Sequence, residues 1–130
     1  MTRCRIAVID DDASVRNALR RLFRCADYDA NSYGSGREFL NDLEHHMPDC
    51  LVVDIHMPEM SGIELQKHLR AHGFGLPCVM ITGHDEEGSK ETCLAVGASR
   101  YLRKPFDETT LLQAVDQAIA AAMHKKVSSF

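Results

Sequence analysis

The stretch Arg5-Ile-Ala-Val-Ile-Asp-Asp-Asp12 joins an apolar run directly to three carboxylates. A short run that is apolar throughout is typical of a strand buried on both faces of a sheet. Similar runs recur along the chain, and each ends at a polar residue: Asp54 after 50–53, Thr82 after 79–81, and Lys104 after the run around 101–102. Parallel strands of one sheet have their carboxyl ends side by side. The pattern therefore predicts one crevice that gathers carboxylates, a hydroxyl and an ammonium group.

Apolar runs alternate with segments of helical periodicity from one end of the chain to the other. Strands are predicted at residues 5–9, 29–33, 50–53, 78–81 and 99–102, and a helical stripe follows each of them, as in Val15, Ala18, Leu19, Leu22 and Phe23. Such alternation implies a parallel sheet with helices on both faces and right-handed crossovers. We predict one doubly wound α/β domain over residues 1–124, with a frayed C-terminal tail at residues 125–130.

Composition favours a globular cytoplasmic protein. The chain has 130 residues, of which 45% are hydrophobic, and no stretch approaches the roughly 20 apolar residues of a membrane span. A strand-like segment begins almost at Met1, so no signal peptide is expected. The formal net charge of −4 argues against direct nucleic-acid binding. Five scattered cysteines without a C-x-x-C pair are interpreted as reduced structural residues.

The predicted crevice suits a divalent metal ion and a phosphoryl group. Carboxylates at a sheet edge can hold Mg²⁺, which prefers oxygen ligands and keeps several waters. Asp54 is then a third ligand beside Asp10 and Asp11, and also a nucleophile able to form an acyl phosphate. Asp12 is expected to cap a helix or to face solvent. Each residue alone has an ordinary explanation, such as a solvated loop or strand-end packing; the ordered set at four strand ends does not.

The chain resembles the receiver domain of bacterial two-component response regulators from about residue 5 to about residue 123. Within that family it looks most similar to regulators of the nitrogen-fixation and nitrate-response type. The matching segments are Val8-Ile-Asp-Asp11, Arg16, Val52-Val-Asp-Ile-His-Met-Pro58, Met60-Ser-Gly62, Ile81-Thr-Gly-His84, Gly97-Ala98 and Tyr101-Leu-Arg-Lys-Pro-Phe106.

The resemblance implies a flavodoxin-like (βα)5 fold with strand order 2-1-3-4-5. It also implies that Asp54 accepts a phosphoryl group from a phosphohistidine on a sensor histidine kinase or a histidine phosphotransfer protein. The metal ion, Mg²⁺ or Mn²⁺, would be held by Asp10, Asp11, Asp54 and the backbone carbonyl of His56. Thr82 and Lys104 would bind phosphoryl oxygens, and the peptide joining Lys104 to Pro105 would be cis.

The same resemblance implies a signalling module rather than a metabolic enzyme, with self-catalysed phosphorylation and dephosphorylation only. Tyr101 would turn inward when Thr82 moves toward the phosphoryl group. The surface formed by the fourth helix, the fifth strand and the fifth helix would then bind a downstream protein or output domain, and a homodimer that forms on phosphorylation is a further expectation. No membrane partner is implied.

The histidines receive separate interpretations. His56 and His84 each lie two residues after a predicted site residue. The resemblance implies that such positions flank the acyl phosphate, and we predict that the two histidines tune its lifetime. His68 and His72 have the i, i+4 spacing of a transition-metal pair, but two exposed residues on a polar helix face are the simpler explanation.

Three other functions fit parts of the pattern. A phosphate-ester hydrolase of the aspartyl-phosphate type usually carries a second aspartate two residues after the nucleophile, where this chain has His56. A receiver-like module that is never phosphorylated would lack one of the key residues, and none is missing. A flavin-binding protein of similar topology would have a phosphate-binding loop after the first strand, where Asp10, Asp11 and Asp12 would repel the flavin phosphate.

Overall fold

A single parallel sheet in the order β2-β1-β3-β4-β5 forms the centre of the protein, as predicted. The computed structural model describes residues 3–128, with side chains described up to residue 124. The strands are β1 (Arg5–Ile9), β2 (Asp29–Tyr33), β3 (Cys50–Asp54), β4 (Cys78–Thr82) and β5 (Arg100–Arg103). Asp54 and Thr82 are thus the last residues of their strands rather than the first residues beyond them, and β5 begins one residue later than predicted.

The helices are α1 (Ala13–Cys25), α2 (Gly36–Asp42), α3 (Gly62–Ala71), α4 (Ser89–Ala95) and α5 (Glu108–Ser128). Asp12 caps α1, because its side chain accepts from the backbone N–H groups of Ser14 and Val15. Helix α5 continues to Ser128, so residues 125–128 of the predicted tail are helical. Residues 129 and 130 of that tail lie outside the described part. Of the helices within residues 3–128, none is both long enough and apolar enough to span a bilayer.

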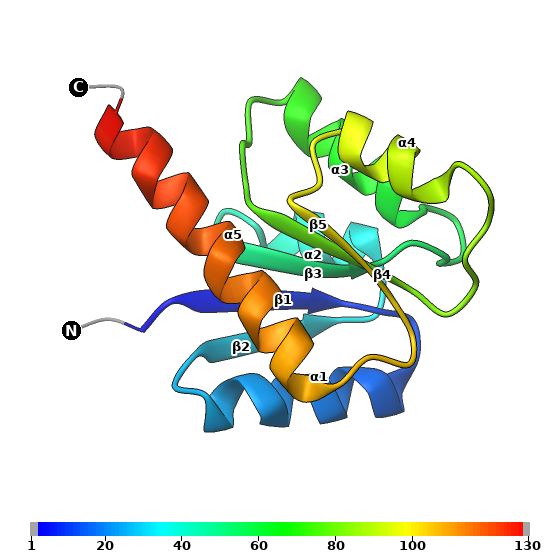
Figure 1. The fold of residues 1–130 in the computed structure, drawn as a ribbon, viewed down its shortest axis with the longest axis horizontal. Helices are drawn as coiled ribbons and strands as arrows, with labels where there is room; N and C mark the ends of the chain where they lie inside the picture. Colours follow the sequence, from blue (N-terminus) through cyan, green and yellow to red (C-terminus); the bar gives the residue numbers. More distant parts are fainter. Residues whose placement is uncertain (1–2, 129–130) are drawn as a thin grey trace.

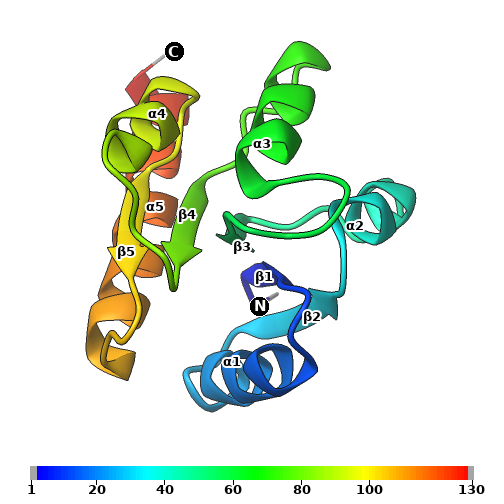
Figure 2. The same cartoon turned by 90° about the vertical axis from the view of Figure 1, so that its right-hand side faces the viewer.

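Helices cover both faces of the sheet (Figures 1 and 2), and the sheet separates two hydrophobic cores. Alternate strand residues point to opposite faces, so Val8 and Val52 pack with α1 and α5, whereas Ile9 and Val53 pack with α2 and α3. Phe23 on the first face and Phe39 on the second are both fully buried. Burial on both faces explains why the strands are apolar at nearly every position.

The strand register aligns the carboxyl ends of β1, β3 and β4. Ile9 pairs with Val53, and Asp54 pairs with Ile81. Beyond the strand ends, the Ile55 N–H still donates to the Ile81 carbonyl at 3.0 Å, and the Lys104 N–H donates to the Thr82 carbonyl at 2.8 Å. The residues that follow the strands are therefore held at one edge of the sheet.

Candidate functional site

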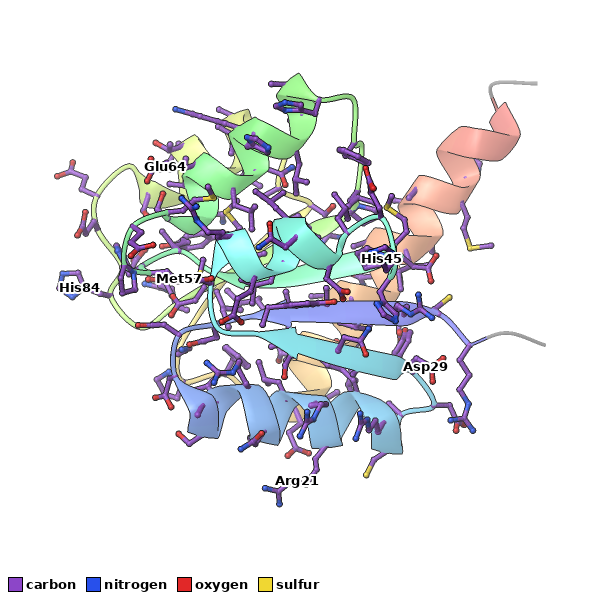
Figure 3. The ribbon with its side chains drawn as sticks, turned by 180° about the vertical axis from the view of Figure 1, so that it is seen from behind. Arg21, Asp29, His45, Met57, Glu64 and His84 are labelled. Atoms are coloured by element: carbon purple, nitrogen blue, oxygen red, sulfur yellow. The ribbon has the colours of Figure 1, made fainter. Side chains whose placement is uncertain are left out.

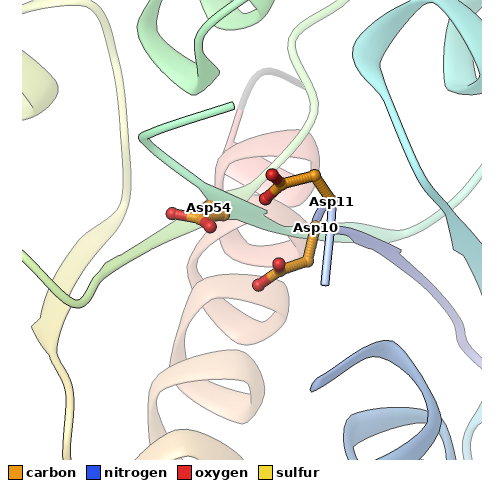
Figure 4. Close-up of side chains that lie close together, drawn as sticks. All are labelled: Asp10, Asp11 and Asp54. Carbon is orange, nitrogen blue, oxygen red and sulfur yellow. The ribbon is translucent and has the colours of Figure 1, made fainter. Parts of the chain in front are cut away.

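Three carboxylates meet at this edge. Asp10 and Asp11 follow β1, Asp54 ends β3, and one ligand oxygen from each lies within 4.8 Å of the others (Figure 4). Asp10 is fully buried and Asp54 is 8% exposed, whereas Asp11 is exposed to solvent. The cluster is therefore buried at Asp10 and Asp54 and open to solvent at Asp11.

Asp10 has a buried oxygen that fits a metal ligand. Its Oδ1 accepts from the Asp12 N–H at 2.9 Å. Its Oδ2 is buried without a hydrogen-bond partner among residues 3–128, and the Lys104 Nζ lies 3.5 Å from it. A buried polar atom without a partner requires an explanation, and a hard cation bound by oxygen ligands would supply one.

Burial raises the pKa of the Asp54 carboxyl above its usual value, and the nearby Asp10 raises it further. The His56 N–H opposes this shift by donating to Asp54 Oδ1 at 3.1 Å. The folded protein therefore brings together like charges that destabilise one another. A bound divalent cation would remove most of that repulsion.

The backbone around Asp54 is held by a glycine whose role the sequence interpretation did not recognise. The Gly62 N–H donates to the Ile55 carbonyl at 2.9 Å. A Cβ atom at Gly62 would lie 2.6 Å from the Asp54 carbonyl oxygen and 3.1 Å from the Ile55 Cα. Only a residue without a side chain lets α3 begin this close to β3. The glycine that ends a proline-containing loop was the available signal, but it was interpreted only as loop punctuation and family resemblance.

Thr82 and Lys104 reach the same edge from β4 and from the end of β5. Thr82 is fully buried, and its Oγ1 donates to the His84 carbonyl and accepts from the His84 N–H, both at 3.0 Å. The Lys104–Pro105 peptide is cis, as expected. Tyr101 lies on β5, three residues before Lys104, and its hydroxyl donates to the Asp85 carboxylate. The site thus gathers Asp10, Asp11, Asp54, Thr82 and Lys104, whereas Tyr101 contacts Asp85 in the loop that follows β4.

The other polar residues singled out from the sequence have identifiable contacts. Arg16 Nη1 donates to the Asp10 carbonyl at 2.7 Å and so supports the end of β1. His56 Nε2 lies 3.1 Å from the His84 carbonyl oxygen, and the His84 side chain projects into solvent (Figure 3). His68 on α3 and His72, the residue that follows this helix, are exposed and have stacked rings. The His72 Nδ1 already contacts the His68 carbonyl.

The raised pKa of Asp54 predicts a specific pH dependence of stability in metal-free protein. The unfolded chain loses this proton near the ordinary value of 3.8, before the folded protein does, so ionisation of Asp54 destabilises the fold as the pH rises above that value. With EDTA present, Asp54→Asn should unfold at a higher temperature than the wild type at pH 7. The difference should vanish as the pH falls below about 3.8. Thermal unfolding across this range, followed by circular dichroism, would measure it; an asparagine variant no more stable than wild type at pH 7 would contradict it.

Comparison with known proteins assigns the family. Residues 6–116 match the family described as the response regulator receiver domain. The chain belongs to this family. The receiver domain is part of two-component signalling systems, and its five-stranded flavodoxin-like fold is confirmed by both sheet order and structural similarity.

Individual relatives support the assignment. The response regulator protein TodT of Pseudomonas putida is 34% identical over 121 residues, which make up 93% of this chain and 53% of TodT. The structure of a response regulator receiver protein from Burkholderia phymatum is 42% identical, with a TM-score of 0.81, and the match covers 91% of this receiver domain and 96% of that chain. Chemotaxis protein CheY4 of Vibrio cholerae is 28% identical, with a TM-score of 0.84 and coverage of 90% and 99%. This receiver domain spans about half the length of TodT.

Proposed function

We propose that this receiver domain accepts a phosphoryl group on Asp54 from a phosphohistidine of a sensor histidine kinase or a histidine phosphotransfer protein. The observation that carries the proposal is the convergence of Asp10, Asp11 and Asp54 within 4.8 Å, with the Lys104 Nζ 3.5 Å from Asp10. Carboxylates that close together suit a cation, and the ammonium group suits an anionic substrate. We place this reaction in the cytoplasm.

Asp10, Asp11, Asp54 and the backbone carbonyl of His56 would hold Mg²⁺ or Mn²⁺. When bound, the ion would neutralise charge on the transferring phosphoryl oxygens. One Oδ of Asp54 attacks phosphorus while the phosphorus–nitrogen bond of the donor breaks, and the imidazole leaves with its electron pair and is protonated. Lys104 would balance the charge on a phosphoryl oxygen, and the Thr82 hydroxyl would donate to another. Hydrolysis of the acyl phosphate by water at the same site would return Asp54 to its carboxylate.

Thr82 and Tyr101 would convert this modification into a change of surface. The Thr82 hydroxyl now donates to the His84 carbonyl, so donation to a phosphoryl oxygen requires it to give up that bond. Tyr101 would then turn inward. The face formed by α4, β5 and α5 would bind the downstream protein or output domain, or a second phosphorylated copy of the chain. The protein acts here as a phosphoacceptor and not as an enzyme with a separate substrate.

Acetyl phosphate provides the direct test of this function. Incubated with acetyl phosphate and Mg²⁺, the protein should gain about one phosphoryl group per chain by intact mass spectrometry. EDTA should prevent the gain, because the carboxylates and the phosphoryl donor repel one another without a cation. A protein that takes no label with Mg²⁺ present would contradict the proposal.

His56 and His84 should influence how long the phosphoryl group remains. His56 Nε2 contacts the His84 carbonyl, and the two imidazole rings lie edge to face with centroids 6.0 Å apart. We expect this pair of rings to limit the access of water to Asp54. We expect His56→Ala and His84→Ala to change the half-life of the labelled protein about two- to tenfold. Timed loss of the phosphoryl group would measure this. His68→Ala, an exposed change on α3, serves as the control, and half-lives equal to that control would refute the role.

A further inference from the structure

Asp85, in the loop between β4 and α4, connects to two side chains of the edge strand β5. One of its carboxylate oxygens accepts from the Tyr101 hydroxyl, and the other accepts from Arg103 Nη1 at 3.2 Å. Tyr101 and Arg103 are two residues apart on one strand, so their side chains lie on the same face. The Asp85 carboxylate therefore connects the β4–α4 loop to β5 through two side chains.

The same contact fixes the orientation of Tyr101. The ring is half-buried against the second hydrophobic core, while its hydroxyl reaches the loop. Hydrogen bonding to Tyr101 lowers the pKa of Asp85, and burial followed by the Asp85 hydrogen bond raises the pKa of the Tyr101 hydroxyl. Both pKa shifts favour a neutral Tyr101 phenol that donates to an ionised Asp85 carboxylate at neutral pH.

The loop also connects Asp85 to the edge where Asp54 lies. The Thr82 Oγ1 is bonded to both backbone polar groups of His84, at 3.0 Å each. His84 directly precedes Asp85 in the chain, and its carbonyl is also contacted by His56. A Thr82 hydroxyl that donates to a phosphoryl group on Asp54 must give up its bond to the His84 carbonyl, because it has a single proton to donate. Losing that bond loosens the peptide that carries Asp85.

We propose that Asp85 is a positioning residue that holds Tyr101 toward the loop until Asp54 is phosphorylated. This inference rests on the proposed function of Asp54 and Tyr101 and names the contact that sets the resting state. The Asp85 carboxylate favours one of two arrangements of Tyr101. Its loss therefore shifts the balance toward the inward arrangement without any phosphoryl group.

The test is Asp85→Ala, with the ring of Tyr101 observed directly. The chain has three tyrosines, so ¹³C-tyrosine labelling gives few NMR signals, and Tyr101→Phe identifies the one needed. Beryllium trifluoride with Mg²⁺, an analogue of the aspartyl phosphate, defines the displaced position of the Tyr101 signal in the wild type.

Glu87→Ala is the matched control, because it removes the same charge from the same loop and Glu87 has no hydrogen bond or ion pair with the described residues. Asp85→Asn keeps an acceptor for the tyrosine hydroxyl and should restore most of the resting signal.

We expect Asp85→Ala, without analogue, to move the Tyr101 signal by at least half of the wild-type displacement. We also expect acetyl phosphate to label it roughly three- to tenfold faster, because a hydrogen bond and an exposed ion pair are lost. A Tyr101 signal that stays at the resting position in Asp85→Ala, or that moves equally in Glu87→Ala, would overturn the inference while the wild type still takes label. A wild type that neither takes label nor moves Tyr101 would overturn the proposed function, and this inference with it.

Discussion

Asp54→Asn should abolish Mg²⁺-dependent labelling by acetyl phosphate. The amide of asparagine has nearly the volume of the carboxylate, so it should fill the site, where Asp54 is 8% exposed, without disturbing β3. It lacks the anionic oxygen that attacks phosphorus, and it weakens the set of metal ligands. Intact mass spectrometry of wild type and variant under identical conditions measures the loss.

Asp12→Asn is the matched control for this result. It makes the same chemical change two residues after Asp10, and asparagine caps helices as well as aspartate does. Since Asp12 caps α1 and lies outside the cluster of three carboxylates, its variant should be labelled like the wild type. Full labelling of Asp54→Asn, or loss of labelling in both variants, would refute the assignment of Asp54 as the phosphoacceptor.

Gly62→Ala should destabilise the protein by about 1–3 kcal/mol or more and should also slow labelling. Helix propensity alone predicts that the substitution stabilises the protein, because alanine is favoured over glycine inside a helix by up to about 1 kcal/mol. A steric clash outweighs this preference, because the new Cβ would lie 2.6 Å from the Asp54 carbonyl oxygen, a backbone atom that cannot rotate away. The start of α3 or the end of β3 must shift, and the Asp54 side chain shifts with it. Urea unfolding and the initial rate of labelling would report the two effects.

Gly75→Ala separates this contact from a general effect of replacing glycine. No atom lies within 4 Å of a Cβ placed at Gly75, and its backbone is not in the left-handed region. The variant should be as stable as wild type, or more stable by up to about 1 kcal/mol because its unfolded chain is less free. Equal stability of Gly62→Ala and Gly75→Ala would show that the close approach of α3 to β3 is not a constraint.

The strands were predictable because burial on both faces requires apolar residues at nearly every position, as in 6–9 and 50–53. The polar residues that follow could be placed at one edge because parallel strands share a direction. The helix at the C-terminal end is longer than expected, because α5 continues to Ser128 through residues that had been interpreted as a frayed tail. Alanine and lysine both favour a helix, and this propensity was left out of the interpretation.

The partners of individual side chains were not predictable. Nothing in the sequence indicates that Asp85 contacts Tyr101, because sixteen positions separate them and no sequence pattern pairs a loop residue with a particular strand residue. The same holds for the Asp10 oxygen without a partner and for the Thr82 hydroxyl bonded to His84.

The sequence by itself determined the order of strands and helices, the family, and the edge of the sheet at which Asp10, Asp11, Asp54, Thr82 and Lys104 gather. Hydrophobic periodicity and residue type carry that information, since burial is a property of whole segments. The tertiary structure alone decided the need for glycine at position 62 and the contact of Asp85 with Tyr101. Both depend on distances of a few ångströms between segments far apart in the chain, and only the packing of α3 on β3 and of the β4–α4 loop on β5 sets those distances.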